Sequence, residues 1–344
     1  MPRRAAVALL FVAFIAVLGV ALVVVGPRVR LERAKDPGLG VRGLHAQGVT
    51  GAGVSVAIID GQLRRDHVEY ADRLVSYEEL DDFSGSPFEM HGPAVASLLV
   101  GRSVGVAPGA ALHYFALDFA RLTPERLAAA IDHVVDRNDA LPPAERVRLL
   151  SVSTGFRGEE RARVDAAVRR AIERDVFVLL SVYPLDYLDP PLAIRGLGCS
   201  PWRDCDRPEA YGVSPGEAAF WRAEGESVGE VLARRADSDD ALGYTTVYAP
   251  AHHRTVAGQH HARHYRYDRE GGDSEWPPYL SGVLALALQV APELHATDLA
   301  GLLAVGAIHG HGLVSPPRVV EMARAHAETG GTAGVVGGSV GGHR

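Results

Sequence analysis

Three residue types that together perform nucleophilic catalysis stand far apart in this 344-residue chain, each beside an apolar segment. Asp60 ends one apolar run, His91 comes directly before a second, and Ser274 lies a few residues before a third. A serine hydroxyl becomes a nucleophile when an imidazole accepts its proton and a carboxylate orients that imidazole. The three side chains are therefore candidates for a catalytic triad, provided that the fold brings them together.

Ser274 lies where a buried helix is expected to begin. Two glycines before it permit a close approach of the backbone, Pro277 and Pro278 suit a first helical turn, and segment 283–288 is too apolar for a surface. A hydroxyl at such a helix start faces unpaired N–H groups and the helix dipole, which stabilise negative charge on a reacting oxygen. Ser274 could equally be a simple helix N-cap, and this stretch alone does not decide between the two roles.

A parallel sheet is expected to position these residues. Apolar segments typical of strands alternate with helical stretches, which predicts an α/β fold of three layers, with a mostly parallel central sheet and helices on both faces. Ligands bind beyond the carboxyl ends of strands in such sheets, where Asp60 is placed. The predicted strands are 54–59, 112–117, 147–152, 176–182 and 245–248; predicted helices begin at His91, Thr123 and Ser274 or cover 159–175, 297–305 and 315–328.

Three motifs, in the order acid, histidine and serine, resemble those of the subtilisin-like serine peptidases. They are residues 56–60, 91–97 and 272–278, and the resemblance covers about 48–325. It implies a subtilisin-like fold and a serine endopeptidase that forms a covalent acyl-enzyme. Ser274 would attack the peptide carbonyl, His91 would act as general base and then acid, and Asp60 would orient His91.

The same resemblance assigns a substrate-binding strand. Ser153, Thr154 and Gly155 match the segment with which an extended peptide would pair as an added strand. An ordinary sheet strand that runs into a turn explains these residues equally well. A peptide or protein in extended conformation is therefore the expected partner.

The oxyanion hole departs from the family pattern. Family members place an asparagine after the strand that corresponds to 176–182, whereas this chain has Tyr183 and Pro184 there, and its only asparagine is Asn138. Tyr183 is the candidate replacement donor, because a phenol O–H can donate to an oxyanion. Loss of such a donor lowers turnover about 100- to 1,000-fold. Two alternatives follow: a catalytically impaired relative that binds peptides, and an esterase-like hydrolase with the same triad.

The chain is expected to be anchored in a membrane. After the flank 1–4, residues 5–26 carry no charge and would span about 33 Å as a helix, enough for a hydrocarbon core of about 30 Å. We expect a single-pass membrane protein with its catalytic domain outside the cytoplasm, although Arg28, Arg30, Arg33 and Lys35, which follow the apolar segment, indicate the opposite orientation. Residues 27–47 are interpreted as a linker, 48–328 as the peptidase domain with a surface insertion at 183–240, and the glycine-rich 329–344 as a disordered tail.

Composition limits the remaining options. A formal net charge of -7 gives no electrostatic footprint for nucleic acid. Cys199 and Cys205 could close one local disulfide in an oxidising compartment or stay reduced. Histidines crowd residues 252–264, but their spacing matches no zinc pattern, so a solvated loop is expected and no metal site is assigned. The proposed chemistry requires no cofactor, and calcium binding is left open.

Overall fold

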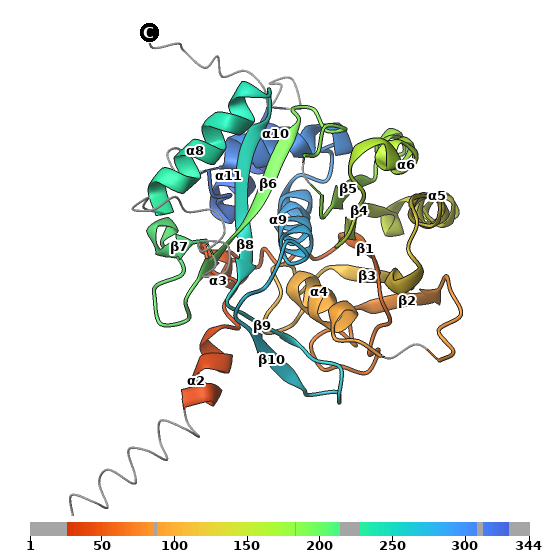
Figure 1. Cartoon of the computed structure of the whole chain (residues 1–344), viewed down its shortest axis with the longest axis horizontal. Helices are drawn as coiled ribbons and strands as arrows, with labels where there is room; N and C mark the ends of the chain where they lie inside the picture. Colours follow the sequence, from red (N-terminus) through yellow and green to blue (C-terminus); the bar gives the residue numbers. More distant parts are fainter. Residues whose placement is uncertain (1–25, 86–87, 183, 214–227, 308–311, 330–344) are drawn as a thin grey trace, which may run out of the picture.

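The computed structural model describes residues 26–85, 88–182, 184–213, 228–307 and 312–329, and a five-stranded sheet forms its centre (Figure 1). Its strand order is β2-β3-β1-β4-β5, and every neighbouring pair is parallel. All carboxyl ends therefore meet at one edge of the sheet. The strands are β1 (Ser55–Asp60), β2 (Leu74–Glu79), β3 (Ala111–Ala116), β4 (Val147–Val152) and β5 (Phe177–Leu180).

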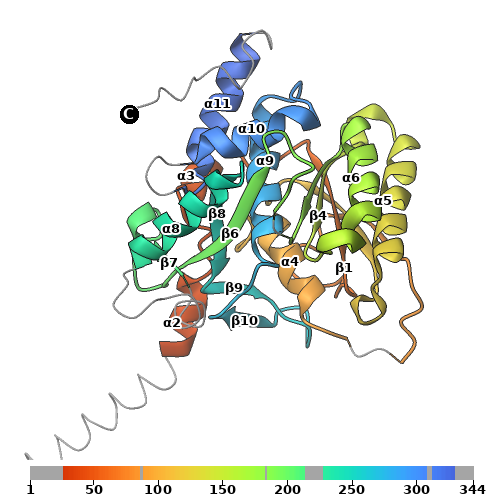
Figure 2. The same ribbon diagram turned by 45° about the horizontal axis from the view of Figure 1, so that its top comes forward.

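Helices cover both faces of this sheet, as predicted. In Figure 2, α4 (His91–Val100) and α9 (Trp276–Val290) lie on one side of β1 and β4, and α5 (Pro124–Asp139) and α6 (Ala162–Glu173) lie on the other. The helices α5 and α6 bury one apolar face each. By contrast, α9 is buried almost all round, because it packs between β4 of the central sheet and a second sheet.

The second sheet corrects the interpretation of 183–240 as a surface insertion. It contains β6 (Leu192–Cys199), β7 (Tyr211–Gly212) and β8 (Thr245–His252) in the order β7-β6-β8. Seven of the eight residues of β6 are buried. The strand is hard to predict from the sequence because Arg195 interrupts its apolar run. In the structure Arg195 forms an ion pair with the buried carboxylate of Asp239 at 3.0 Å. Three helices complete this side of the molecule: α8 (Val228–Ala241), α10 (Ala296–Gly306) and α11 (Pro316–Glu328).

The histidine-rich segment forms an antiparallel hairpin, where a solvated loop had been expected. Its strands are β9 (Arg254–Ala257), which is wholly buried, and β10 (Tyr265–Asp268). His252, at the end of β8, is also buried. Because charged residues interrupt its strands and histidines lie beside them, this hairpin shows no apolar run by which it could be predicted. Short 3-10 helices occupy Phe119–Arg121, Pro143–Glu145, Gly158–Arg161 and Pro208–Ala210.

Residues 27–47 are part of the folded domain, so the expectation of a linker is wrong. They form α2 (Gly26–Arg33) and α3 (Val41–Ala46), and Val41 and Leu44 lie in the hydrophobic core. The backbone N–H of Thr255 donates to the carbonyl of Ala34 at 2.9 Å, which fixes the end of α2 to β9. Arg30 and Lys35 also stack on the rings of Tyr267 and Tyr265 in β10, at 4.6 and 4.2 Å.

The expected membrane anchor stays a prediction. Among the residues that the structure describes, no helix is both long enough and apolar enough to cross a bilayer. All of the anchor except Gly26 lies outside the described residues, as does the glycine-rich tail from 330 onward.

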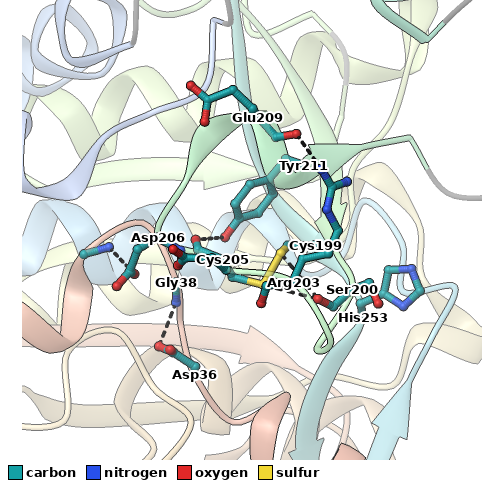
Figure 3. Close-up of a disulfide and its surroundings, with 12 residues drawn as sticks. Asp36, Gly38, Cys199, Ser200, Arg203, Cys205, Asp206, Glu209, Tyr211 and His253 are labelled. Carbon is teal, nitrogen blue, oxygen red and sulfur yellow. Dashed lines mark hydrogen bonds between the residues drawn. A yellow bond between two sulfur atoms is a disulfide. The ribbon is translucent and has the colours of Figure 1, made fainter.

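The two cysteines form a disulfide, which the sequence left open. The Cys199–Cys205 bond joins the last residue of β6 to the loop that follows it (Figure 3). The carbonyl of Cys205 accepts hydrogen bonds from the backbone N–H of Leu39 at 2.8 Å and from the hydroxyl of Tyr211 at 3.1 Å. The disulfide loop therefore holds the segment between α2 and α3 against β7.

Candidate active site

Asp60 and His91 form a hydrogen-bonded pair at the carboxyl edge of the central sheet. Asp60 is the last residue of β1 and is fully buried, and His91 is the first residue of α4. The distance from His91 Nδ1 to Asp60 Oδ1 is 2.7 Å. A proton on Nδ1, donated to the carboxylate, leaves Nε2 free to accept a proton from a nucleophile. This is the geometry that an acid and a base of a triad require.

The electrostatics of the pair favour the imidazolium. Burial lowers the pKa of His91, but the charge and hydrogen bond of Asp60 and the nearby charge of Glu89 outweigh it and raise the pKa above its ordinary value. The ring of Phe119 packs edge-on against the imidazole, with a centroid distance of 6.1 Å. A proton taken up by His91 is therefore well stabilised.

Activity is expected to rise with pH through a midpoint above 6.5, the ordinary pKa of histidine. A general base must be neutral, and the raised pKa of His91 keeps the imidazole protonated to a higher pH. The dependence of kcat/KM on pH for a peptide substrate would show this midpoint. A midpoint at or below 6.5 would contradict the electrostatic role of Asp60 and Glu89.

Ser274 lies at the same edge of the sheet, two residues before α9. Its Oγ donates a hydrogen bond to the carbonyl of Ser153 at 3.2 Å, and the Oγ of Ser153 donates to the carbonyl of Ser274 at 2.8 Å. Ser153 directly follows β4, whose last residue Val152 pairs with Ile59 of β1. Ser274 is thus attached to the strand next to the one that carries Asp60.

The simple N-cap role for Ser274 is wrong. The N-cap of α9 is Glu275, and no side chain caps this helix. The hydroxyl of Ser274 is directed instead to Ser153, and no hydrogen bond joins it to His91 in the described part of the chain. The contact that would complete the triad stays a prediction, although α4 and α9 pack against one another.

Two glycines position the nucleophile loop against β8. A Cβ added to Gly271 would lie 1.8 Å from the carbonyl oxygen of Ala251, and Gly271 has a φ of 54°. The backbone N–H of Gly272 donates to that same carbonyl at 3.1 Å. Only glycine permits this close approach at position 271.

The predicted substrate strand has a free edge and a closely packed wall. Thr154 and Gly155 are partly exposed, and neither forms a backbone hydrogen bond within the described residues. Across from them, Ser181 extends β5 by donating to the carbonyl of Val152 at 2.9 Å, and Val182 packs against Gly155. A Cβ added to Gly155 would lie 1.8 Å from Val182 Cγ1. Glycine is therefore required next to Val182.

Asn138 cannot serve as the oxyanion donor. It lies in the last turn of α5, and its side chain donates to the carbonyl of Val147 at 3.0 Å and accepts from the N–H of Val147 at 2.7 Å. Val147 begins β4, so Asn138 stands at the opposite edge of the sheet from Ser274. Tyr183, the proposed replacement, lies outside the described residues.

Sequence reasoning missed a buried carboxyl beside the nucleophile. Glu275 is 7% exposed, and burial raises the pKa of its carboxyl well above the usual value, with the charge of Arg254 acting in the opposite direction. Burial therefore favours the neutral form of this carboxyl. A charged residue type at the start of an otherwise apolar helix is the signal that could have identified it.

Comparison with known proteins gives similarity to subtilisin-like proteases. No family model matches the chain. The chain is 25% identical over 317 residues to the subtilisin-like protease PopC of Myxococcus xanthus (strain DK1622), a match that covers 82% of this chain and 62% of PopC. The chain thus spans less than two thirds of that relative's length.

Solved structures share the fold. The prenylagaramide maturation protease PagA superimposes with a TM-score of 0.55 at 17% identity, over 83% of this chain and 98% of PagA. A chain of the subtilase cytotoxin SubAB gives a TM-score of 0.55 at 15% identity, over 86% and 97% of the two chains. The chain is thus similar in sequence to a subtilisin-like protease and shares the fold of solved structures of such proteins.

Proposed function

We propose that the protein is a serine endopeptidase that uses Ser274, His91 and Asp60. The observation that carries the proposal is the 2.7 Å hydrogen bond from His91 to the buried Asp60, at the sheet edge to which Ser153 attaches Ser274. The similarity to PopC, itself described as a subtilisin-like protease, supports hydrolysis of peptide bonds. An acid, a base and a nucleophile at one edge of a parallel sheet are the components that acyl transfer requires.

The reaction would begin when the hydroxyl of Ser274 leaves the carbonyl of Ser153 and turns toward His91. His91 Nε2 takes the proton as Oγ attacks the peptide carbonyl, and the resulting imidazolium is stabilised by Asp60. The proton then passes to the departing amine, which leaves an ester on Ser274. Water, activated by the same imidazole, hydrolyses this ester and regenerates the free serine.

The substrate would bind in extended form along Thr154 and Gly155. The backbone groups of both residues are free of hydrogen bonds within the described chain, so a peptide strand can pair with them. Ser153 fixes the register, because it bonds directly to Ser274. The bond to be cleaved is thereby placed beside the nucleophile.

Labelling with a fluorophosphonate tests this proposal. Wild-type protein is expected to be labelled on Ser274, and Ser274→Ala is expected to stay unlabelled. Ser281→Ala is the matched control, because Ser281 lies in the same helix, is 1% exposed and should not affect labelling. Folded wild-type protein that resists the probe, or Ser274→Ala that reacts as fast as wild type, would contradict the proposal.

A peptide-binding module without activity is the second candidate. The observation in its favour is that the only asparagine of the chain, Asn138, is engaged at the far edge of the sheet. A missing oxyanion donor slows acyl transfer but leaves the substrate strand intact. Equal affinity of wild type and Ser274→Ala for a peptide library, with no product from wild type, would favour this candidate.

A further inference from the structure

A cavity of about 190 Å³ opens directly beside the general base. It is lined by His91 and Asp60, by the aromatic rings of Phe83 and Phe119, and by the acidic Glu89, among others. Because the imidazole forms part of its wall, a side chain that fills this cavity belongs to a residue next to the bond that is cleaved.

The aromatic rings of the cavity suit a long side chain with an apolar stem. Phe83 and Phe119 are both partly exposed and come from the two loops that follow β2 and β3. Phe119 packs on the imidazole of His91, so its ring position is fixed. Methylene groups can pack against such rings, and a guanidinium can stack on them.

The charge of the cavity is negative and only partly compensated. Asp60 is engaged by His91, and Asp118 accepts hydrogen bonds from the N–H of Ala120 at 3.0 Å and from Nε of Arg121 at 2.8 Å. The carboxylate of Glu89 is exposed and forms no hydrogen bond or ion pair within the described residues. Among the described residues that line the cavity, none is a lysine or an arginine.

We propose that this cavity binds an arginine side chain of the substrate near the scissile bond, and that Glu89 determines this preference. The inference rests on the proposed peptidase function. The planar guanidinium matches a carboxylate through two parallel hydrogen bonds and also stacks on aromatic faces, which a lysine ammonium does less well. The cavity offers both kinds of contact, from Glu89 and from the two phenylalanines.

The charge of Glu89 reaches the imidazole, since it contributes to the raised pKa of His91. A guanidinium bound at Glu89 would offset that charge. For substrates with arginine in the cavity, the acid limb of the pH profile of kcat is therefore expected to lie at lower pH than for substrates with an uncharged side chain there.

Peptides that differ only in arginine or citrulline test the inference. Citrulline has nearly the same shape as arginine but no charge, and the pair is placed at each position around the scissile bond in turn. One position is expected to favour arginine about tenfold in kcat/KM, and Glu89→Gln is expected to remove most of that preference. Glu293→Gln is the control, because Glu293 is exposed and follows the far end of α9 from Ser274.

Binding of the same peptides to Ser274→Ala separates this inference from the proposed function. Cleavage of both peptides at equal rates, with equal affinities, would overturn the role of Glu89 and leave the peptidase intact. Absence of cleavage, with arginine-selective binding that Glu89→Gln abolishes, would support the cavity and overturn the peptidase. Absence of any preference for arginine in both assays would overturn the inference outright.

Discussion

Replacement of Ser274 by alanine is expected to lower kcat on a peptide about 10⁶-fold, and replacement of Asp60 by asparagine about 10⁴-fold, as such changes do in known serine peptidases. The geometry explains why the loss of kcat is expected to be larger for Ser274→Ala than for Asp60→Asn. Ser274 would form the covalent intermediate, whereas Asp60 acts only through its 2.7 Å hydrogen bond to His91. Asparagine at position 60 can donate to Nδ1, which would place the imidazole proton on Nε2, where it blocks uptake of the serine proton.

Steady-state and single-turnover rates on one fluorogenic peptide would measure both losses. Circular dichroism would establish that the variants are folded, since Asp60 is fully buried. Ser281→Ala is expected to retain the wild-type rate to within a fewfold. If Asp60→Asn retained wild-type turnover, the Asp60–His91 pair would have no part in catalysis.

Replacement of Gly155 by alanine is expected to lower kcat/KM about 100-fold and to destabilise the protein by about 1–3 kcal/mol. The added methyl group would lie 1.8 Å from Val182 Cγ1, and Val182 is a buried β-branched side chain that cannot turn away freely. Either Val182 or the substrate strand must move. Since Ser153 bonds to Ser274, a displaced strand would also displace the nucleophile.

Denaturant unfolding and kcat/KM for one peptide would measure this effect. The double variant Gly155→Ala, Val182→Ala is expected to recover much of the lost activity, because it removes the overlapping methyl groups. Gly43→Ala is the matched control, because a Cβ there has nothing within 4 Å and Gly43 lies within α3. Equal behaviour of Gly155→Ala and Gly43→Ala would contradict the packing argument.

Four of the five strands of the central sheet could be predicted because they are nearly continuous apolar runs, whereas β2 has no buried residue and was not predicted. β1, β3, β4 and β5 are each buried along most of their length, so the sequence alone indicates them. The position of Asp60 at the end of β1 and of His91 at the start of α4 follows from the same runs. The hydrogen bond between these two side chains could not be predicted from a local sequence pattern, because it joins residues 31 positions apart.

The remaining elements depend on partners far away in the chain. β6 contains an arginine that is tolerated only because Asp239 meets it, and α3 is buried by the core rather than by its own composition. The hydrogen bond between Ser274 and Ser153 joins residues that are 121 positions apart in the sequence. Glu89 belongs to no motif, and only its place in the wall of the cavity beside His91 suggests the role proposed for it.

The Cys199–Cys205 bond makes one loop of the molecule sensitive to the redox state of its surroundings. Cellular thiol systems in the cytosol keep cysteine pairs reduced, whereas exported proteins keep such bonds. The loop closed by this bond supplies the carbonyl of Cys205 to Leu39 and Tyr211. In a reducing compartment the loop would lack this covalent closure, and hydrogen bonds alone would hold the segment before α3 to the carbonyl of Cys205.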